Sequence, residues 1–530
     1  MIEIRDISLS PNDSLNRLVQ QAAKHLRIRE HEIVRLLIRK KSIDARKKQD
    51  VRIIYTVNVE VKEREDKLLK RIHDPKVSLA EEYAYSIPVP VRFPFQRPVI
   101  IGFGPAGMFA ALVLAEAGLK PIVLERGADA KTRHQKVQEF WKTGNLDPQC
   151  NVQFGEGGAG TFSDGKLNTG IKNSRIRWVL EQLADAGAHA EILFDAKPHI
   201  GTDVLLEVVQ NIRHRIQHLG GEIIFNAKMT ELQLNSGSIA AVTYTQDNKA
   251  HTLPCSHVVL AIGHSARDTF RQLHMQGIPM EPKPFSMGVR IEHLQSMIDQ
   301  TQYGPFAGAP SLPPADYKLN VKLPEVGSAY TFCMCPGGYV VAAASEPGRV
   351  VTNGMSECAR DGRNANSAVL VTLHPEDFPS KDVLGGMYWQ QEIEETAYIA
   401  GGRNYHAPAQ LVGDFLQHRA STKLGSVQPT YRPGVTLCDL HDVLPDAIAN
   451  VLELAIPELD KRLKGFASDD AVLTAPETRS SSPVRILRDD TFQSSIKGLF
   501  PCGEGAGYAG GITSAAVDGM LCAEALIHSL

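Results

Sequence analysis

Long apolar segments and a basic leader are missing from this chain of 530 residues. No apolar run reaches the ~20 residues that a helix needs to cross a bilayer. The first residues do not combine basic charge with an apolar stretch, so we expect no secretory signal. Cysteine is sparse, with 8 residues, which excludes a disulfide framework and favours reduced thiols. These absences predict a cytoplasmic protein without a membrane partner.

Metal-binding and redox-cysteine motifs are also lacking. Cys333 and Cys335 form a C-x-C pair, which does not have the C-x-x-C spacing of redox-active disulfides, and no second pair completes a zinc site. We therefore predict no metal centre and no disulfide-reductase chemistry, and we interpret most thiols as buried apolar side chains. The apolar content of 43% and the charged content of 22% are ordinary for a globular protein.

Residues 98–127 carry the pattern of a dinucleotide-binding unit. An apolar strand-like run leads into Gly102-x-Gly104-x-x-Gly107, a helical stretch follows, and a second apolar run ends at Glu125. In this motif the first glycine allows the tight turn, the second lets the backbone approach a pyrophosphate, and the third lets helix pack on strand. Glu125 lies where a carboxylate can accept hydrogen bonds from a ribose diol. The pattern predicts an adenine dinucleotide as ligand.

Two further segments, 155–160 and 505–510, fit the same glycine spacing. The first is followed by residues 161–165, which show no helical apolar period, and the second lies too close to the C-terminus for a helix, a return strand and an acidic residue. Only the first unit, Gly102 to Glu125, has the strand–turn–helix–strand context that the motif requires.

The chain divides into a small basic module and two larger parts. Residues 1–90 read as an α+β module, because an apolar helical stripe is followed by strict alternation over 51–61. Residues 1–97 hold 21 Lys and Arg against 14 Asp and Glu, a charge of +7, concentrated at 39–41 and 46–48. Such clusters can meet phosphates or an acidic surface, although they more often form a solvated face.

The rest of the chain reads as an α/β architecture. We predict a discontinuous Rossmann-like domain over 98–280 and 476–530, with an inserted α+β domain over 281–475 that faces the substrate. Strand-like pieces separated by Pro- and Gly-rich loops distinguish the inserted part. Residues 221–229 and 239–244 read as strands of a meander, which puts Met229 at a strand end.

Three separated segments of the sequence favour FAD over NAD as the predicted dinucleotide. The glycine motif is joined by an apolar strand that ends in Ala261-x-Gly263, and by a C-terminal strand that leads to Gly503-Glu504 and a helix. Together they resemble the glutathione-reductase-type FAD-binding fold. The resemblance implies that Glu125 holds the adenosine ribose and that Glu504 lies by the ribityl chain, where most members carry Asp.

The resemblance also implies further contacts. Met229 would offer backbone groups to adenine, and the helix after Gly511 would direct its N–H groups at the flavin. The predicted cofactor-contacting residues are Gly102, Gly104, Pro105, Ala106, Gly107, Glu125, Arg126, Gly158, Gly160, Thr161, Lys166, Met229, Ala261, Gly263, Gly503, Glu504, Gly511 and Ile512.

A second resemblance spans nearly the whole chain. The motifs at 155–166, 284–293, 331–338 and 502–514 resemble those of a bacterial family of uncharacterised FAD-dependent dehydrogenases. The resemblance implies a flavoprotein with a basic N-terminal module and supplies no substrate.

These observations predict an FAD-dependent oxidoreductase that transfers hydride between the flavin and an unidentified small molecule. No second dinucleotide unit is present, so NAD(P)H would have to act as a transient electron donor. An RNA-linked role through the basic module and a non-catalytic flavin-binding role remain alternatives. No residue receives a catalytic assignment: Lys166, His264, the pair Arg290 and Glu292, and the segment 479–485 each have a structural interpretation as well.

Overall fold

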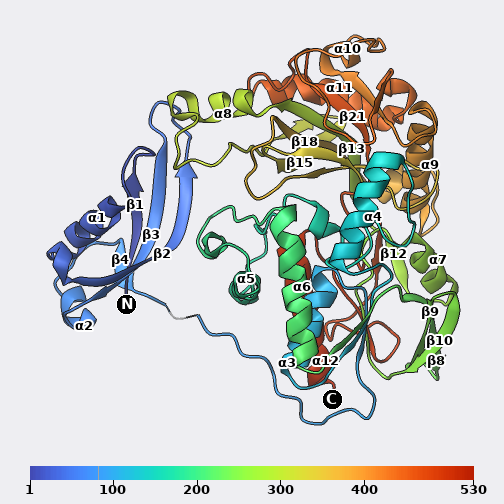
Figure 1. The fold of residues 1–530 in the computed structure, drawn as a ribbon, viewed down its shortest axis with the longest axis horizontal. Helices are drawn as coiled ribbons and strands as arrows, with labels where there is room; N and C mark the ends of the chain where they lie inside the picture. The colour runs from blue at the N-terminus through green and yellow to red at the C-terminus, as the bar shows by residue number, and fades with distance from the viewer. Residues whose placement is uncertain (82) are drawn as a thin grey trace.

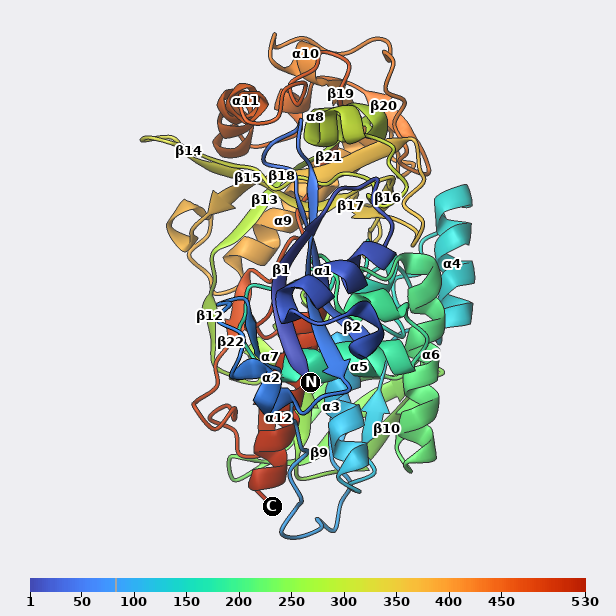
Figure 2. The same cartoon turned by 90° about the vertical axis from the view of Figure 1, so that its left-hand side faces the viewer.

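The computed structural model describes residues 1–81 and 83–530. A small N-terminal module stands beside two larger domains, and the two domains are stacked on one another (Figure 1; Figure 2). The lower of the two domains contains residues 99–275 and 499–528. The module connects to it through residues 83–98, among which the structure shows no helix or strand.

The N-terminal module is a four-stranded antiparallel sheet in the order β2-β3-β1-β4. Its helix α1 packs on one face, where Leu18, Ala22 and Leu26 join the apolar side of β3. The alternation predicted over 51–61 is confirmed, since Ile53, Tyr55, Val57, Val59 and Val61 are buried there. The elements are β1 (Ile2–Leu9), α1 (Asn16–Leu26), β2 (Ile33–Asp44), β3 (Arg52–Val61), α2 (Glu65–Leu69) and β4 (Val77–Leu79).

The module contacts the lower domain through strand β2. The backbone N–H of Lys41 donates to the Phe194 carbonyl at 2.7 Å, and the N–H of Ala196 donates back to the Lys41 carbonyl at 2.8 Å. The Lys41 ammonium also lies 3.4 Å from the Asp195 carboxylate. These contacts join the module to the segment that precedes α6 (Thr202–His218).

The lower domain is built on a five-stranded parallel sheet in the order β23-β11-β5-β6-β7. Its edge strand β23 comes from the C-terminal part of the chain, so two separated segments of the sequence build this sheet. The strands are β5 (Val99–Ile101), β6 (Ile122–Leu124), β7 (Glu222–Ile224), β11 (Val258–Leu260) and β23 (Leu499–Pro501). All five are short, and β5, β6, β11 and β23 are apolar and buried on both faces, as expected for a parallel sheet that is covered on each side. The edge strand β7 begins with the exposed Glu222.

Helices cover one face of this sheet, and a small antiparallel sheet covers the other. On the first face α3 and α12 pack side by side, with α6 next to α3. The opposite face carries the three-stranded sheet β10-β9-β8 and helix α7. The elements are α3 (Pro105–Glu116), α4 (Ala130–Thr143), α5 (Arg175–Asp185), β8 (Lys228–Asn235), β9 (Ser238–Gln246), β10 (Lys249–Pro254), α7 (Arg267–Met275) and α12 (Ile512–His528).

The meander differs from the prediction at its first strand. Residues 221–229 do not form one strand, because β7 ends at Ile224 in the parallel sheet and Asn226 adopts a left-handed conformation with a φ of 53°. Met229 therefore lies at the beginning of β8.

The upper domain is a seven-stranded sheet in the order β14-β15-β18-β13-β21-β19-β20. All neighbours in it are antiparallel except β19 and β20. Helices α8 and α11 pack against this sheet, as does α9. The elements are β13 (Phe285–Leu294), α8 (Gln295–Tyr303), β14 (Asn320–Leu323), β15 (Gly327–Cys335), β16 (Tyr339–Ala342), β17 (Thr352–Met355), β18 (Asn364–Leu373), α9 (Gly385–Ala400), β19 (Ala407–Leu411), α10 (Val412–Phe415), β20 (Val435–Leu437), α11 (Asp446–Asp460) and β21 (Val472–Glu477).

The two domains are joined by a pair of short antiparallel strands. β12 (Met280–Pro282) leads into the upper domain and pairs with β22 (Val484–Ile486), which leads out of it. Within residues 1–81 and 83–530, no helix is long and apolar enough to cross a bilayer.

Candidate functional site

A cavity with a volume of about 400 Å³ lies between the lower and upper domains. One end is lined by the loops that follow β5, β6 and β11, and the other end by β15 of the upper domain and the loop that precedes α12. Cavities of this size are typical of cofactor and small-molecule sites.

The first glycine motif forms one end of this cavity. Gly102 has a φ of 97°, and a Cβ atom there would lie 2.3 Å from the carbonyl oxygen of Ala261. A Cβ atom at Gly107 would lie 2.0 Å from the Gly102 carbonyl oxygen, so this glycine allows α3 to pack on β5. Gly104, Pro105 and the first turn of α3 line the cavity. Free N–H groups at such a helix N-terminus form an anion site suited to a pyrophosphate.

Glu125 holds three loops at this end of the cavity. Its side chain is 4% exposed. One carboxylate oxygen accepts the N–H of Phe103 at 2.8 Å, and the other accepts the N–H groups of Gly127 and Gly155, each at 2.9 Å. Glu125 lines the cavity, as the ribose assignment requires, but most of its acceptor capacity is used by the protein backbone. Sequence reasoning missed this bracing role.

Arg126 also lines the cavity, and its guanidinium is engaged by the protein. It donates to both carboxylate oxygens of Asp268, at 3.0 and 2.8 Å, and stacks over the ring of Phe154 at 4.0 Å from the centroid. With Lys228, Arg126 holds the pKa of Asp268 well below its usual range despite burial. The Arg126 side chain on the cavity wall is thus held in place by its ion pair with Asp268.

The remaining predicted residues divide into those that reach the cavity and those that lie behind its wall. Gly107, Thr161 and Gly503 do not line it: Thr161 Oγ1 donates to the Glu156 carbonyl and the Gly503 N–H donates to Asp518 at 2.7 Å. The other predicted residues on the wall, beyond those described above, are Ala106, Gly158, Gly160, Lys166, Met229, Ala261, Gly263, Glu504, Gly511 and Ile512.

A buried arginine holds the glycine-rich loop 155–166 in place. Arg133 of α4 is 0% exposed. Its guanidinium donates to backbone carbonyl groups of the residues Asn151, Val152, Gly155, Glu156 and Gly158. The polar helical stretch 130–143 gives no sequence signal of this, because the carbonyl groups become neighbours only in the folded loop.

A buried group of charges lies at the far end of the cavity. Asp164 is 0% exposed, its carboxylate lies 3.0 Å from the Lys166 ammonium, and it accepts hydrogen bonds from Arg360 and Ser356. Burial opposes ionisation, but Lys166 and Arg360 keep the pKa of Asp164 below its usual range. Lys166 and Arg360 line the cavity, so one carboxylate faces two cations beside it.

Cys333 lies on the cavity wall at an irregular point of β15. The register of β15 with β18 shifts between Phe332 and Cys335, and Cys333 has a φ of 43°. This left-handed conformation is uncommon for a residue with a side chain and is concentrated at functional sites. The Cys335 thiol donates to the Cys333 carbonyl at 3.2 Å. The neighbouring Cys335 side chain, together with the charges of Lys166 and Arg290, lowers the pKa of the Cys333 thiol. Sequence reasoning, which treated these thiols as apolar, missed this residue.

Glu504 projects into the same end of the cavity. Burial raises the pKa of its carboxyl group to about 7, although Lys283 opposes the shift. Gly511, with a φ of 101°, precedes the first turn of α12, so that a second helix N-terminus faces the cavity. The site therefore combines two anion-binding helix ends with a carboxyl group that changes charge near neutral pH.

The structure also shows the surroundings of Arg290, Glu292 and His264, which the sequence left without an assigned role. Arg290 is 0% exposed and donates to both oxygens of Glu477, at 2.9 and 3.1 Å, so its role is structural. Glu292 is likewise buried, and it accepts from Thr430. His264 lines the cavity, and burial lowers its pKa to about 3.

Arg479 also lines the cavity, but its guanidinium is already paired. It donates to both carboxylate oxygens of Glu394, at 3.0 and 2.9 Å.

These features fit a dinucleotide with a flavin end. The glycine motif and the first turn of α3 form an anion site of the kind that suits a pyrophosphate, Glu125 and Arg126 line the same end, and the N-terminus of α12 meets the cavity at Gly511. The cavity connects these groups within one volume.

Comparison with known proteins identifies relatives of the chain. Residues 284–480 match the family described as FAD-dependent protein, C-terminal domain-like, and residues 1–60 match a domain of unknown function, DUF8436. An uncharacterised protein from Clostridium beijerinckii is 49% identical over 530 residues, which covers 99% of this chain and 98% of that protein.

Solved structures share the fold only loosely. A flavin-dependent brominase is 12% identical, with a TM-score of 0.35, over 80% of this chain and 76% of its own. A geranylgeranyl bacteriochlorophyll reductase-like protein from Thermoplasma acidophilum is 12% identical, with a TM-score of 0.37, over 82% and 78%. These values carry no functional argument. The chain belongs to the same family as the Clostridium beijerinckii protein, and with its FAD-dependent C-terminal domain-like region it is an FAD-dependent flavoprotein.

Proposed function

We propose that the protein is an oxidoreductase that transfers hydride between FAD and a small-molecule substrate. The observation that carries this proposal is the single cavity shared by the two domains, because it joins the nucleotide end to a group of ionisable side chains. FAD, when bound, supplies the hydride chemistry, and the protein supplies binding, orientation and proton transfer.

The polar end of the cavity offers a defined set of roles. Lys166 and Arg360 flank the carboxylate of Asp164 and line the cavity, so an anionic group of a substrate can pair with these two cations. Glu504 can hold or release a proton near neutral pH, which is what a general acid or base needs. Cys333 presents a thiol with a lowered pKa, and thiolates are nucleophiles. These three elements make substrate binding and proton transfer possible in one place.

The direct test is spectroscopic. We expect the purified protein to be yellow and to release FAD on denaturation. Anaerobic mixing with NADH, NADPH and a panel of small anionic metabolites should bleach the flavin with at least one of them. Protein that binds FAD but exchanges electrons with no compound of the panel would favour the non-catalytic alternative, and protein that takes up no FAD would contradict the proposal.

Glu504 predicts a dependence of stability on pH. Its pKa is raised to about 7 in the folded state. The contribution of the protonated carboxyl group to the free energy of unfolding is therefore fully present below pH ~4.5 and is lost as the pH rises through about 7. We expect Glu504→Gln to gain stability relative to the wild type between pH 5 and pH 8, by on the order of 2 kcal/mol. Urea unfolding at both pH values measures this difference. Glu207→Gln, an exposed carboxylate on α6, should show no such change, and identical profiles for the two variants would contradict the assignment.

A second candidate function is an RNA-linked role through the N-terminal module. Of its two basic triplets, Lys41 and Arg46 form ion pairs with carboxylates. The other four residues form none within residues 1–81 and 83–530: Arg39, Lys40, Lys47 and Lys48. Unpaired basic side chains on a strand and its hairpin are suited to phosphate contacts.

Binding to bulk tRNA tests this second candidate. If all four basic side chains contact phosphates, raising the salt from 50 to 200 mM should weaken binding by roughly fiftyfold. Replacing the four residues by glutamine should remove most of this salt dependence. No binding at 50 mM salt, or equal binding by the variant, would exclude the role.

A further inference from the structure

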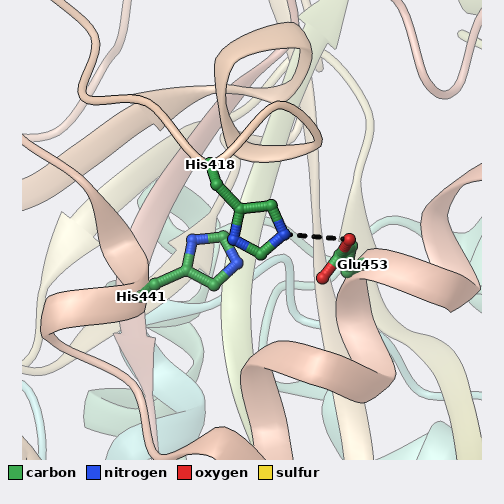
Figure 3. A group of neighbouring side chains, drawn as sticks. All are labelled: His418, His441 and Glu453. Atoms are coloured by element: carbon green, nitrogen blue, oxygen red, sulfur yellow. Dashed lines mark hydrogen bonds and ion pairs between the residues drawn. The ribbon is translucent and has the colours of Figure 1, made fainter.

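A group of two histidines and a glutamate lies in the upper domain, apart from the residues that line the cavity. Figure 3 shows His418 and Glu453 facing one another, with the ring of His441 beside them. His418 follows α10, His441 lies in the short helix Leu440–Asp442, and Glu453 belongs to α11. One ligand atom of each residue lies within 4.8 Å of the others.

His441 is oriented by a carboxylate on its far side. Its Nδ1 atom lies 2.8 Å from Asp439 Oδ1, which makes Nδ1 the protonated nitrogen and leaves the lone pair on Nε2. Nε2 is buried and has no hydrogen-bond partner in the part of the chain that the structure describes. A ring nitrogen bonded to a carboxylate, with the other nitrogen free, is the usual arrangement of a metal-ligating histidine.

His418 is held over His441 by its backbone and by stacking. It has a φ of 51°, and its ring lies 4.3 Å from the His441 ring, centroid to centroid. His418 Nε2 lies 3.0 Å from Glu453 Oε1, and the ring of Phe415 packs on the opposite face of His441 at 4.5 Å. The backbone conformation is uncommon for a side chain of this size, and it places a second imidazole beside the free nitrogen of the first.

We propose that His418, His441 and Glu453 form a zinc site. Two imidazoles and one carboxylate are a ligand set that suits Zn²⁺ better than Ca²⁺ or Mg²⁺, which prefer oxygen ligands. Zinc bonds of ~2.0–2.2 Å place tetrahedral ligand atoms roughly 3.3 Å apart. His418, whose side chain is 56% exposed, can complete the approach by a side-chain rotation. The bound ion would join the loop after α10 to α11.

A second group of potential metal ligands within the described residues is already paired with an arginine side chain. Cys502, Asp518 and Cys522 have ligand atoms close together, but the Arg488 guanidinium donates to both oxygens of Asp518, at 3.0 and 2.6 Å, and to the Cys522 sulfur. That arginine supplies the positive charge, so the histidine group is the stronger candidate.

Calorimetric titration of the chelator-treated full-length protein with ZnCl₂ tests the proposal. We expect one zinc site per chain. The zinc affinity should fall by at least a hundredfold in His441→Ala and by at least tenfold in Glu453→Gln, which keeps a hydrogen-bond acceptor for His418. Asp439→Asn should weaken binding tenfold to a hundredfold, because it loosens the orientation of His441. Zinc should also raise the melting temperature of the wild type and leave that of His441→Ala unchanged.

The control is His274→Ala, which removes an exposed histidine of α7 and should bind zinc like the wild type. The melting temperature of each variant without zinc shows whether it is folded. Equal zinc affinity in the wild type and His441→Ala, or no binding by the wild type at micromolar zinc, would overturn the proposal. Neither result depends on the reaction that FAD supports.

Discussion

Replacement of Glu125 by alanine should weaken FAD binding by at least a hundredfold. The carboxylate accepts three backbone N–H groups, from Phe103, Gly127 and Gly155. Each buried donor left without a partner costs about 1–3 kcal/mol, and each 1.4 kcal/mol corresponds to about tenfold in affinity. The three costs do not add fully, but all three loops meet at the glycine-motif end of the cavity, so their displacement would act on the same bound FAD.

Titration of the FAD-free protein with FAD measures this effect. Glu125→Gln should lie between the wild type and the alanine variant, because its amide keeps one oxygen acceptor and turns an NH₂ group toward a backbone donor. Glu116→Ala serves as the matched control, since this carboxylate of α3 pairs with Arg215 near the surface and is worth at most about 1 kcal/mol. Equal FAD affinity in the two alanine variants would show that Glu125 does not organise the site.

Alkylation of Cys333 by iodoacetamide should depend only weakly on pH. An ordinary thiol, with a pKa of ~8.5, loses roughly fiftyfold in thiolate content when the pH falls from 8.5 to 6.5. Because the pKa of Cys333 is lowered by Cys335 and by nearby cations, we expect its labelling rate to fall by less than about threefold over this range. Peptide mass spectrometry of the FAD-free protein follows each cysteine separately.

Internal and engineered controls make the labelling experiment decisive. Burial raises the pKa of Cys358, so its labelling should fall steeply in the same samples. Cys335→Ala removes the thiol that neighbours Cys333, and Lys166→Met removes a nearby positive charge. Each should slow Cys333 labelling at pH 6.5 by about tenfold or more, because the pKa returns toward its usual value. A steep fall for Cys333 in the wild type would remove it from the reactive groups of the site.

The conformation of the glycine-motif end of the cavity was predictable because its signals are local. Gly102 and Gly107 are required by backbone conformation and by contacts within one strand–turn–helix unit, and a sequence motif records such requirements directly. The alternation over 51–61 is local in the same way. What the motif does not record is which backbone groups reach Glu125, since Gly155 lies 30 residues along the chain.

At the far end of the cavity Lys166, Glu504 and Gly511 were named from the sequence, whereas Cys333 was not, because the contacts that shape its surroundings are not local in the sequence. The C-x-C spacing of Cys333 and Cys335 suggested inert thiols, and nothing in it indicates a shifted strand register or a left-handed residue. Thr161 and Gly503 belong to recognisable motifs, yet they support the wall from behind. His418 and His441 have no motif spacing, because the fold of the upper domain alone brings them together.

The paired strands β12 and β22 have a consequence for the ancestry and engineering of this chain. Pro282 and Val484 face each other across the pair, at the ~5 Å separation of neighbouring antiparallel residues. A two-residue hairpin turn would bridge such a gap. The path of the lower-domain chain therefore does not depend on what is inserted between these strands. Met387 of α9 packs in the core of the lower domain and Glu394 pairs with its buried Arg267, so an exchanged domain would have to supply equivalent groups. A lineage could keep its nucleotide-binding half while it substitutes the half that meets the substrate.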